Sequence, residues 1–326
     1  MIIVTGGAGF IGANLVKGLN VHGYDDVLVV DDLTDGQKVI NLADCRIADY
    51  IDKSDFLRMV ESRRSMGSID AVFHNGACSD TMETDGRYMM QSNYTYSRRI
   101  LEYCTSLKIP LIYASSASVY GNGRDFSEHE ECEHPLNVYA YSKWLFDQHV
   151  RLRGRQIKSQ VVGLRYFNVY GPREQHKGRM ASVAFHFYNQ YKSVGKIRLF
   201  EGTAEYGNGE QRRDFVWVGD VVDVNLFFLE HPDKNGIFNV GTGNSQSFND
   251  VATAVINAYD RTNCPLQELV ETEAIEYISF PEALEGKYQS YTQADISALR
   301  GIGYDNAFST VEEGVRQYVD WRKANG

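Results

Sequence analysis

The chain has 326 residues, of which 43% are hydrophobic and 23% are charged, values typical of a globular protein with a sizeable buried core. Its formal net charge of −10 disfavours nucleic acid as a partner, because binding to phosphates requires a basic surface. No apolar run reaches the ~18 residues of a membrane-spanning helix. The opening "MIIVTGGAGF" leaves no room for a signal peptide, so we expect a cytoplasmic protein without a membrane partner.

The cysteines and histidines are also informative. Five cysteines are scattered along the chain without a CxxC pair, and the eight histidines show no HExxH spacing. These patterns predict free thiols, and they favour neither a disulfide framework nor a metal site.

Short apolar runs alternate with helical patterns through the first half of the chain. Strands are predicted in "IIVTGG", "DVLVVDD", "AVFHNGA", "LIYASSA" and "VVGLRYFNVYG", with helices at "IGANLVKGLN", at about 88–107 and from about Tyr139. The strands are apolar on both faces, which is typical of a parallel sheet covered by helices on both sides. The predicted fold is therefore α/β, a doubly wound parallel sheet of Rossmann type.

The pattern changes after Gly171 and Pro172. Polar loops, glycine clusters and shorter elements follow, while "RDFVWVGDVVDVNLFFLEH" and "GIFNVGTG" are typical of a return to the sheet. We therefore expect a Rossmann-type NAD(P)-binding domain at 1–170. A smaller, interleaved substrate-binding domain is expected at 171–326, with about 213–241 returning to the first domain.

The first strand runs into a glycine-rich turn, "GGAGFIG". Gly6 or Gly7, with Gly9 and Gly12, would permit a tight turn and a close approach of the backbone to a pyrophosphate at the helix N-terminus. Asp31 follows about 20 residues later, where an acidic residue binds the adenosine ribose in dinucleotide-binding folds. The alternative is an ordinary glycine turn in another α/β fold.

The stretch "VYAYSK" at 138–143 offers two tyrosines upstream of one lysine. In a helix, residues four apart share a face, so Tyr139 and Lys143 project together and Tyr141 points elsewhere. A tyrosine acting as a base near neutrality needs its pKa lowered by ~3 units, about 4 kcal/mol, which a lysine and a nicotinamide cation could supply. Ser116, at a strand's carboxyl end, lies where ligands bind. The alternative is that Ser116 caps a turn and Tyr139 packs.

Together, "GGAGFIG", "YASSASVYG" and "YAYSK" resemble the extended short-chain dehydrogenase/reductase family. Further stretches, of which "GPREQHKGRMASVAFH" is the most specific, resemble its ADP-heptose 6-epimerases in order along nearly the whole chain. The resemblance implies NADP-dependent oxidation of carbon 6 of ADP-D-glycero-D-manno-heptose to a ketone, followed by reduction from the other face. It also implies a homopentamer and a role in lipopolysaccharide core biosynthesis.

The resemblance also implies roles for individual residues. The catalytic residues would be Ser116, Tyr139, Lys143 and Lys177, with Lys177 serving a second position of the ketone oxygen. The residues implied around the cofactor are Gly6, Gly9, Phe10, Ile11, Gly12, Asp31, Asp32, Lys38, Lys53, Asn75, Gly76, Ala77, Cys78, Ser79, Ser92, Lys143, Val169 and Lys177. Those implied around the substrate are Asn168, Arg179, His186, Phe200, Glu201, Gly202, Thr203, Arg213 and Tyr288.

Two of these assignments have plain alternatives in the sequence itself. Lys177 is a lysine in a polar loop, which by itself indicates an exposed side chain. Arg179 and Arg213 suit a pyrophosphate because guanidinium groups match phosphate oxygens, but Arg213 could instead form a surface ion pair with Asp214 or Glu210.

The sequence departs from the family pattern at several positions. Asp32 stands where asparagine is usual, Asn75 where glutamate is frequent and Ser92 where asparagine is usual, and 204–211 resembles an insertion. Asp32 should repel a 2′-phosphate. Lys38 and Lys53 should attract one, so we expect NADP to be preferred and NAD to be accepted.

Two other functions remain open from the sequence. A related epimerase or a 4,6-dehydratase would share the fold, but dehydratases tend to carry an Asp-Glu pair where this chain has Ala117 and Ser118 after Ser116. A non-catalytic NADP-sensing protein would commonly lose the Tyr139 and Lys143 pair, which this chain retains.

Overall fold

The computed structural model describes residues 1–154, 156–202, 205–281 and 289–325. The chain forms two compact units, each made of discontinuous segments. Unit 1 comprises Met1–Tyr166, Val221–Val240 and Ser297–Asp305, and unit 2 comprises Phe167–Asp220, Gly241–Ile296 and Asn306–Gly326. The substrate-binding role expected for the second half stays a prediction.

Unit 1 is built on a parallel sheet, as predicted. Its described strands lie in the order β11-β6-β5-β4-β1-β2-β3, and all neighbours are parallel. The bounds are β1 Ile2–Thr5, β2 Val27–Asp31, β3 Asp49–Asp52, β4 Ala71–His74, β5 Leu111–Ser116, β6 Val161–Tyr166 and β11 Gly236–Val240. The strand order reverses between β1 and β4, the switch point at which doubly wound sheets bind ligands beyond the carboxyl ends of the strands.

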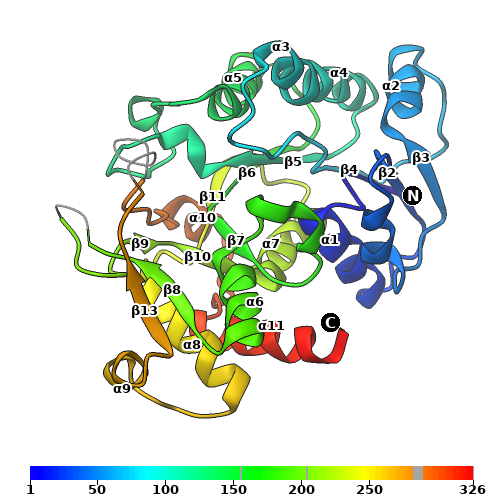
Figure 1. Ribbon diagram of the computed structural model, residues 1–326. Helices are drawn as coiled ribbons and strands as arrows, with labels where there is room; N and C mark the ends of the chain where they lie inside the picture. The colour runs from blue at the N-terminus through cyan, green and yellow to red at the C-terminus, as the bar shows by residue number, and fades with distance from the viewer. Residues whose placement is uncertain (155, 203–204, 282–288, 326) are drawn as a thin grey trace. The chain divides into compact units, whose positions relative to one another are not determined.

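Helices cover both faces of this sheet. Helices α4 and α5 lie on one face, and α1 and α7 lie on the other (Figure 1). Their bounds are α1 Phe10–Val21, α4 Tyr96–Leu107, α5 Val138–Arg153 and α7 Val218–Glu230. Every residue of β1, β2 and β4 is buried, as the apolar runs predicted. Strand β3 was not predicted, because its sequence DYID is polar and it lies half-exposed at the edge of the sheet.

The helix expected over about 88–107 is interrupted. It consists of α3 (Gly86–Met89), a π-helical turn η2 (Met90–Thr95) and α4. Such turns are rare and occur often at functional sites. Asn93, inside this turn, is 2% exposed.

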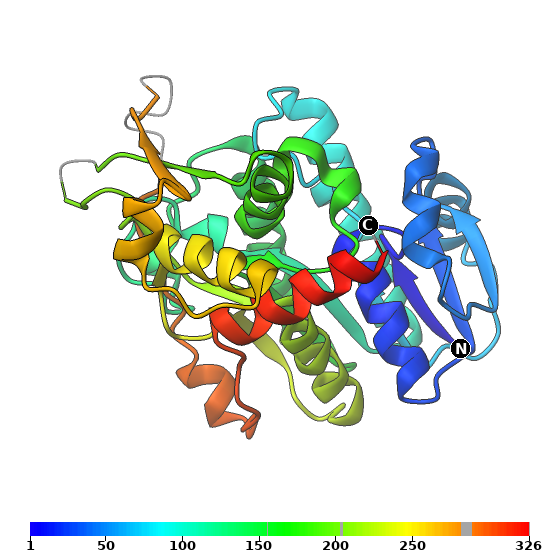
Figure 2. The same cartoon turned by 60° about the horizontal axis from the view of Figure 1, so that its bottom comes forward.

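Unit 2 contains short strand pairs and a helical core. Strand β7 (Asn168–Tyr170) pairs with β10 (Phe215–Trp217), β8 (Ile197–Phe200) with β13 (Ile275–Ile278), and β9 (Arg212–Arg213) with β12 (Gln246–Ser247). Helix α8 (Phe248–Asp260) lies beside α11 (Val311–Asn325) in Figure 2, and their buried side chains pack with those of α6 (Val183–Val194). The segment "RDFVW" thus belongs to unit 2, and the chain returns to unit 1 at Val221.

The remaining described elements are short. They are η1 Gly36–Leu42, α2 Lys53–Glu61, η3 Ala117–Tyr120, η4 Glu130–Cys132, η5 Gln175–Met180, α9 Leu266–Glu271 and α10 Ser297–Gly301. None of the helices that the structure describes has the length and hydrophobicity of a membrane span. The five cysteines are free thiols.

A close contact in unit 2 yields a stability prediction. A Cβ at Gly314 of α11 would lie 2.0 Å from Oη of Tyr170, a buried hydroxyl without a hydrogen-bond partner among the described residues. We predict that Gly314→Ala lowers the free energy of unfolding by about 1–3 kcal/mol through overpacking. Tyr170→Phe should be nearly neutral, and adding it to Gly314→Ala should restore part of the lost stability in urea unfolding, because Cζ of the ring would remain 2.9 Å from the added Cβ. A stabilising Gly314→Ala single variant would contradict this packing.

Candidate active site

The glycine turn between β1 and α1 is shaped by close backbone contacts. Gly6 has φ +67°, and a Cβ there would lie 2.6 Å from the backbone nitrogen of Gly76. A Cβ at Gly12 would lie 2.0 Å from the carbonyl oxygen of Gly6. Larger residues at these positions would push the turn open, so the glycines hold the compact turn that the sequence predicted.

The residues around this turn fit a dinucleotide. Gly9 is the N-cap of α1 and supplies no capping side chain, and no acidic residue lies in the first turn, so the helix N-terminus suits an anion. The side-chain oxygen Oδ1 of Asn75, just beyond β4, is buried without a partner in the described part of the chain. The backbone of Gly6, Gly9 and Gly12 would hold a pyrophosphate here, and the Asn75 amide would offer an acceptor.

Asp31, at the end of β2, organises this turn. Its carboxylate is 6% exposed. It accepts hydrogen bonds from the backbone N–H of Ala8 at 2.8 Å, the backbone N–H of Asp32 at 2.7 Å and Nζ of Lys38 at 3.0 Å. The protein itself therefore supplies three donors to Asp31, and binding of this carboxylate to a ribose stays a prediction.

Both lysines expected at a 2′-phosphate contact acidic residues. Lys53 Nζ lies 2.6 Å from Oδ2 of Asp32, and this bond is the main reason that the pKa of Asp32 falls well below its usual range. Lys38 donates to the backbone carbonyl of Asp32 at 2.8 Å as well as to Asp31. The charge of Asp32 is thus partly neutralised within the protein.

The helical expectation for "VYAYSK" is confirmed. Helix α5 begins after Asn137, whose side chain accepts from the backbone N–H of Ala140 at 2.8 Å. Tyr139 is half-buried, whereas Tyr141 is 43% exposed and its ring lies against Trp144. The geometry therefore favours Tyr139 over Tyr141 as the partner of Lys143.

Lys143 is 8% exposed and donates to the backbone carbonyl of Ala114 on β5 at 2.8 Å. Burial lowers its pKa to about 8, against the opposing influences of Asp147 and Cys78. Two further N–H donors of the ammonium group remain for other partners. A buried, protonated lysine at this position can stabilise negative charge on a neighbouring oxygen.

Tyr139 and Ser116 lie together, and Ser116 also has the capping role weighed as an alternative. Burial raises the pKa of Tyr139, and a hydrogen bond with Ser116 partly opposes this effect. The Ser116 hydroxyl also accepts from the backbone N–H of Ser118 at 3.2 Å and caps η3. The raised pKa is opposite in direction to the lowering that a base at neutral pH needs, because burial outweighs the hydrogen bond with Ser116.

Sequence reasoning did not single out Asn93 as a site residue. Its amide accepts from the backbone N–H of Cys78 at 2.8 Å, and it donates to the Cys78 carbonyl at 3.0 Å and to Oγ of Ser142 at 3.1 Å. Asn93 thereby ties the loop after β4 to α5. The feature that marks Asn93 as a candidate site residue is the π-helical turn, and no residue spacing in the sequence predicts that turn.

In unit 2, Lys177 lies in η5 and is half-buried, so the simple expectation of an exposed loop lysine is wrong. Burial lowers its pKa, and Glu174 opposes that effect. Glu174 is fully buried and accepts from the backbone N–H and the hydroxyl of Ser182, at 2.6 and 2.7 Å, and from the backbone N–H of Gly171 at 3.3 Å. One carboxylate therefore closes the loop that presents Lys177.

Arg213 is 6% exposed, so its side chain does not lie on the surface. It donates to the backbone carbonyl of Arg212 at 2.9 Å, and its guanidinium lies over the ring of Phe248. The Asp214 carboxylate instead binds the backbone N–H and hydroxyl of Thr242 and the backbone N–H groups of Gly243 and Ala294, at 2.7–2.9 Å.

The insertion-like segment before Arg213 is anchored in its described part, 205–211. Asn249 of α8 donates to the backbone carbonyl of Asn208 at 2.9 Å and to Glu210 at 2.6 Å. Gln211 donates to the backbone carbonyl of Glu201 at 3.2 Å. These hydrogen bonds fix the position of the segment that leads to Arg213 within unit 2.

The other expected site residues are distributed over both units. Phe10 and Ile11 begin α1, Gly76 to Ser79 follow β4, and Ser92 lies in η2. In unit 2, Asn168 and Val169 lie on β7, Arg179 in η5, His186 on α6 and Phe200 on β8, with Glu201 and Gly202 following β8. Thr203 and Tyr288 lie outside the described residues.

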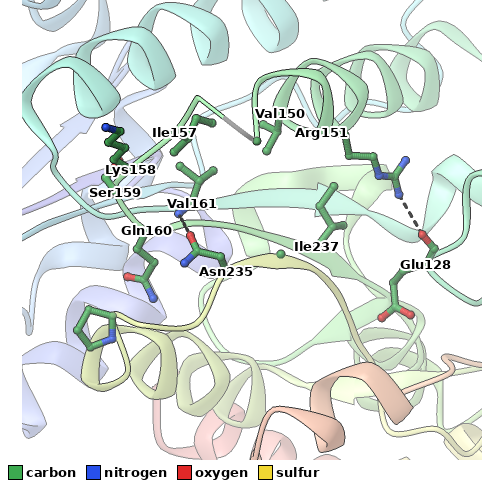
Figure 3. Close-up of a pocket in the computed structure, with 13 residues that line it drawn as sticks. Glu128, Val150, Arg151, Ile157, Lys158, Ser159, Gln160, Val161, Asn235 and Ile237 are labelled. Carbon is green, nitrogen blue, oxygen red and sulfur yellow. Dashed lines mark hydrogen bonds between the residues drawn. The ribbon is translucent and has the colours of Figure 1, made fainter.

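A cavity of about 690 Å³ opens elsewhere on unit 1, at the amino ends of β6 and β11 (Figure 3). Asn235 accepts there from the backbone N–H of Val161 at 2.8 Å, and Arg151 donates to the backbone carbonyl of Glu128 at 3.0 Å. The described lining consists of Glu128, Val150, Arg151, Gly154, Ile157, Lys158, Ser159, Gln160, Val161, Pro232, Asn235, Gly236 and Ile237. These residues include none of those expected at the active site, which we expect at the opposite ends of the strands.

A parallel sheet with a glycine turn at its switch point and a Ser116, Tyr139 and Lys143 group at its carboxyl ends defines a nicotinamide-dinucleotide-dependent class of enzyme. The chain belongs to the NAD dependent epimerase/dehydratase family, whose pattern matches residues 2–241.

Individual relatives are similar to this chain over nearly its whole length. An ADP-L-glycero-D-manno-heptose-6-epimerase from Thiobacillus denitrificans is 60% identical over 322 residues, covering 98% of this chain and 97% of the relative. The crystal structure of the Helicobacter pylori enzyme of the same name is 29% identical, with a TM-score of 0.79 and coverage of 99% and 96%. A Thermus thermophilus UDP-glucose 4-epimerase solved in complex with NAD is 27% identical, with a TM-score of 0.79 and coverage of 100% and 99%.

Proposed function

We propose that this protein is a nucleotide-sugar epimerase that interconverts ADP-D-glycero-D-manno-heptose and ADP-L-glycero-D-manno-heptose at carbon 6. The observation that carries the proposal is the 60% identity with the Thiobacillus denitrificans relative across nearly the full length of both chains. The arrangement of Ser116, Tyr139 and Lys143 supports the same chemistry from the structure.

A nicotinamide dinucleotide supplies reversible hydride transfer when it is bound. The protein's own residues must then move the proton of the carbon 6 hydroxyl and stabilise charge on its oxygen. Tyr139 is the proposed proton-transfer group. Its raised pKa keeps it protonated at neutral pH, the form that donates a proton to the ketone oxygen during reduction.

Lys143 and Ser116 have supporting roles in this proposal. The ammonium group of Lys143, held on the Ala114 carbonyl, would stabilise negative charge on Tyr139 when Tyr139 acts as a base. The hydroxyl of Ser116 would hydrogen bond the phenol and the reacting oxygen.

Inversion of configuration explains why a second acid–base group is needed. Hydride leaves carbon 6 from one face of the sugar and must return to the opposite face of the ketone. The ketone therefore turns over, and its oxygen occupies two positions in succession. Tyr139 would serve one position and Lys177 the other, and the lowered pKa of Lys177 suits a lysine that exchanges protons near neutrality.

NADP is the proposed cofactor, with NAD as an accepted alternative. Lys38 and Lys53 near the end of β2 would contact a 2′-phosphate, and the bond between Lys53 and Asp32 reduces the repulsion from Asp32. By resemblance, we also propose a cytoplasmic homopentamer acting in lipopolysaccharide core biosynthesis.

The proposed reaction is tested directly by NMR of the purified protein with ADP-D-glycero-D-manno-heptose. Appearance of the L-glycero epimer, with conversion approaching the same ratio from either epimer, is expected. Turnover of another nucleotide sugar instead, or loss of water from the sugar, would overturn the substrate or the reaction type.

The two tyrosines of α5 give a matched pair of variants. Tyr139→Phe should reduce kcat by about 10²–10⁴-fold, the usual contribution of a general acid–base group. Tyr141→Phe removes the same atom from an exposed ring and should leave kcat within about twofold. Steady-state kinetics checks both, and comparable losses in the two variants would overturn the assignment.

Lys177→Met should block epimerisation while dinucleotide binding persists, because only one position of the ketone oxygen would then be served. Combining it with Tyr139→Phe should be only modestly worse than either change alone, since each direction needs both groups in turn. Lys192→Met is the control, because it makes the same chemical change on the exposed last turn of α6. Near wild-type turnover in Lys177→Met would remove this residue from the mechanism.

Cofactor preference depends on the charges at the end of β2. Charge-assisted contacts of Lys38 and Lys53 with a 2′-phosphate are worth ~1.5–3 kcal/mol each, but repulsion between the phosphate and Asp32 offsets much of this gain. We therefore predict that NADP binds roughly tenfold more tightly than NAD. Asp32→Asn should widen this ratio by freeing Lys53, and Lys53→Ala or Lys38→Ala should narrow it. Titration of cofactor-free protein with both dinucleotides measures the ratio, and tighter binding of NAD would show that these side chains do not face the 2′ position.

A further inference from the structure

Three residues on one face of α5 lie one turn apart. Tyr139, Lys143 and Asp147 are spaced i, i+4, i+8, so they share the helix face. The proposed reaction uses the first two. Asp147 is completely buried, and the costs of burying a carboxylate are high unless donors surround it, so its surroundings indicate what it does.

Asp147 accepts hydrogen bonds from the two β5 residues that flank Ala114, the residue whose carbonyl binds Lys143. Its carboxylate accepts from the hydroxyl of Tyr113 at 2.9 Å and from the hydroxyl of Ser115 at 2.9 Å. Lys143 donates to the carbonyl of Ala114, between them, at 2.8 Å. Successive turns of α5 are therefore attached to successive residues of β5, the strand that ends at Ser116.

Asp147 is also part of a buried ionic network. Arg165 of β6, completely buried, donates through Nε to Asp147 at 3.0 Å and forms a second ion pair with Glu133. Arg151 binds Glu133 at 2.6 Å. Two arginines and two carboxylates balance one another, which leaves the ammonium of Lys143 as the additional charge beside this network.

We propose that Asp147 is a positioning residue for the catalytic pair: its bonds to Tyr113 and Ser115 fix α5 on β5 so that Tyr139 and Lys143 meet Ser116. This inference rests on the proposed function for its catalytic meaning, but the attachment itself concerns only residues of unit 1. The network would thus set both the place and the protonation state of Lys143.

Several ionisable groups influence Lys143, and Asp147 is the strongest that favours its charged form. Cys78 acts in the same direction more weakly, and His74 is buried and neutral at physiological pH because burial lowers its pKa to about 3. The ionisable groups on α5 and on the elements packed against it include Tyr139, Asp147, His74 and Cys78, while Tyr113 and Arg165 bind Asp147.

The test measures the protonation of Lys143 without any substrate. Protein labelled with ¹³C at lysine Cε is titrated by NMR, and the Lys143 signal is identified by its loss in Lys143→Arg. The wild-type midpoint is expected near pH 8. In Asp147→Asn, which keeps the side-chain shape but removes the anion, the midpoint should fall by about one unit, the lower end of the effect of a nearby opposite charge. In Asp147→Asn, Lys143 would therefore lose its charge at a pH closer to neutrality.

Glu133→Gln is the matched control. It removes a carboxylate from the same network and leaves Arg165 and Arg151 under-compensated, but the hydrogen bonds described for Glu133 go to Gln148, Arg151 and Arg165 and not to β5. Both variants should therefore lower Tm, whereas only Asp147→Asn should lower the Lys143 midpoint. An unchanged midpoint in Asp147→Asn, or equal shifts in both variants, would reduce Asp147 to a purely structural role and overturn the proposal.

A double variant covers the case in which Asp147→Asn does not fold. Asp147→Asn/Arg165→Met removes both partners of the buried pair, which is far less damaging than removing one. Arg165 is not among the groups that shift the pKa of Lys143, so the Lys143 midpoint should still fall, and a wild-type midpoint would overturn the proposal. If ADP-heptose turnover fails in the wild-type protein while the midpoint shifts as expected, the proposed function is wrong and the positioning of Lys143 stands.

Discussion

The attachment of α5 to β5 is the constraint on which the site in unit 1 depends. An ammonium and a carboxylate, four residues apart on one helix face, both bind the strand whose last residue is Ser116. A side chain on a helix is directed by the whole helix, so a small rotation of α5 would carry Tyr139 away from Ser116. Burial makes these bonds strong, because water cannot replace either partner.

Buried carboxylates have a related role at three other places in the chain. Asp31 binds the backbone of the glycine turn, Glu174 closes the loop of Lys177, and Asp214 gathers the segments around Thr242 and Ala294 beside Arg213. In each case the acid accepts mainly from backbone N–H or hydroxyl groups. A carboxylate offers several acceptor positions in a small volume, so one residue can fix a loop that has no regular hydrogen bonding of its own.

This arrangement separates residues that hold the backbone in place from the residues proposed to take part in the reaction. The bonds of Asp31, Asp147, Glu174 and Asp214 are filled by the protein itself. Lys143 is buried and Lys177 is half-buried, and burial lowers the pKa of both, which makes their charge sensitive to nearby groups. Neighbouring carboxylates, Asp147 and Glu174, oppose the effect of burial in both cases. Each unit therefore carries a lysine whose proton affinity is tuned by an acid that also shapes the backbone.

The sequence by itself determined the parallel sheet, the glycine turn and the helical pairing of Tyr139 with Lys143, because these follow from local patterns: apolar runs, glycine spacing and the i, i+4 rule. Resemblance then implied residues without a local signal, such as Lys177. Only the tertiary structure decided that Lys177 and Arg213 are shielded, that Asp31 serves the glycine turn, and that Asp147 and Asn93 support the site. Those properties depend on donors from other segments of the chain, such as Ala8 for Asp31 and Tyr113 for Asp147. Burial by residues that are far apart in the chain produces no periodic pattern in the sequence.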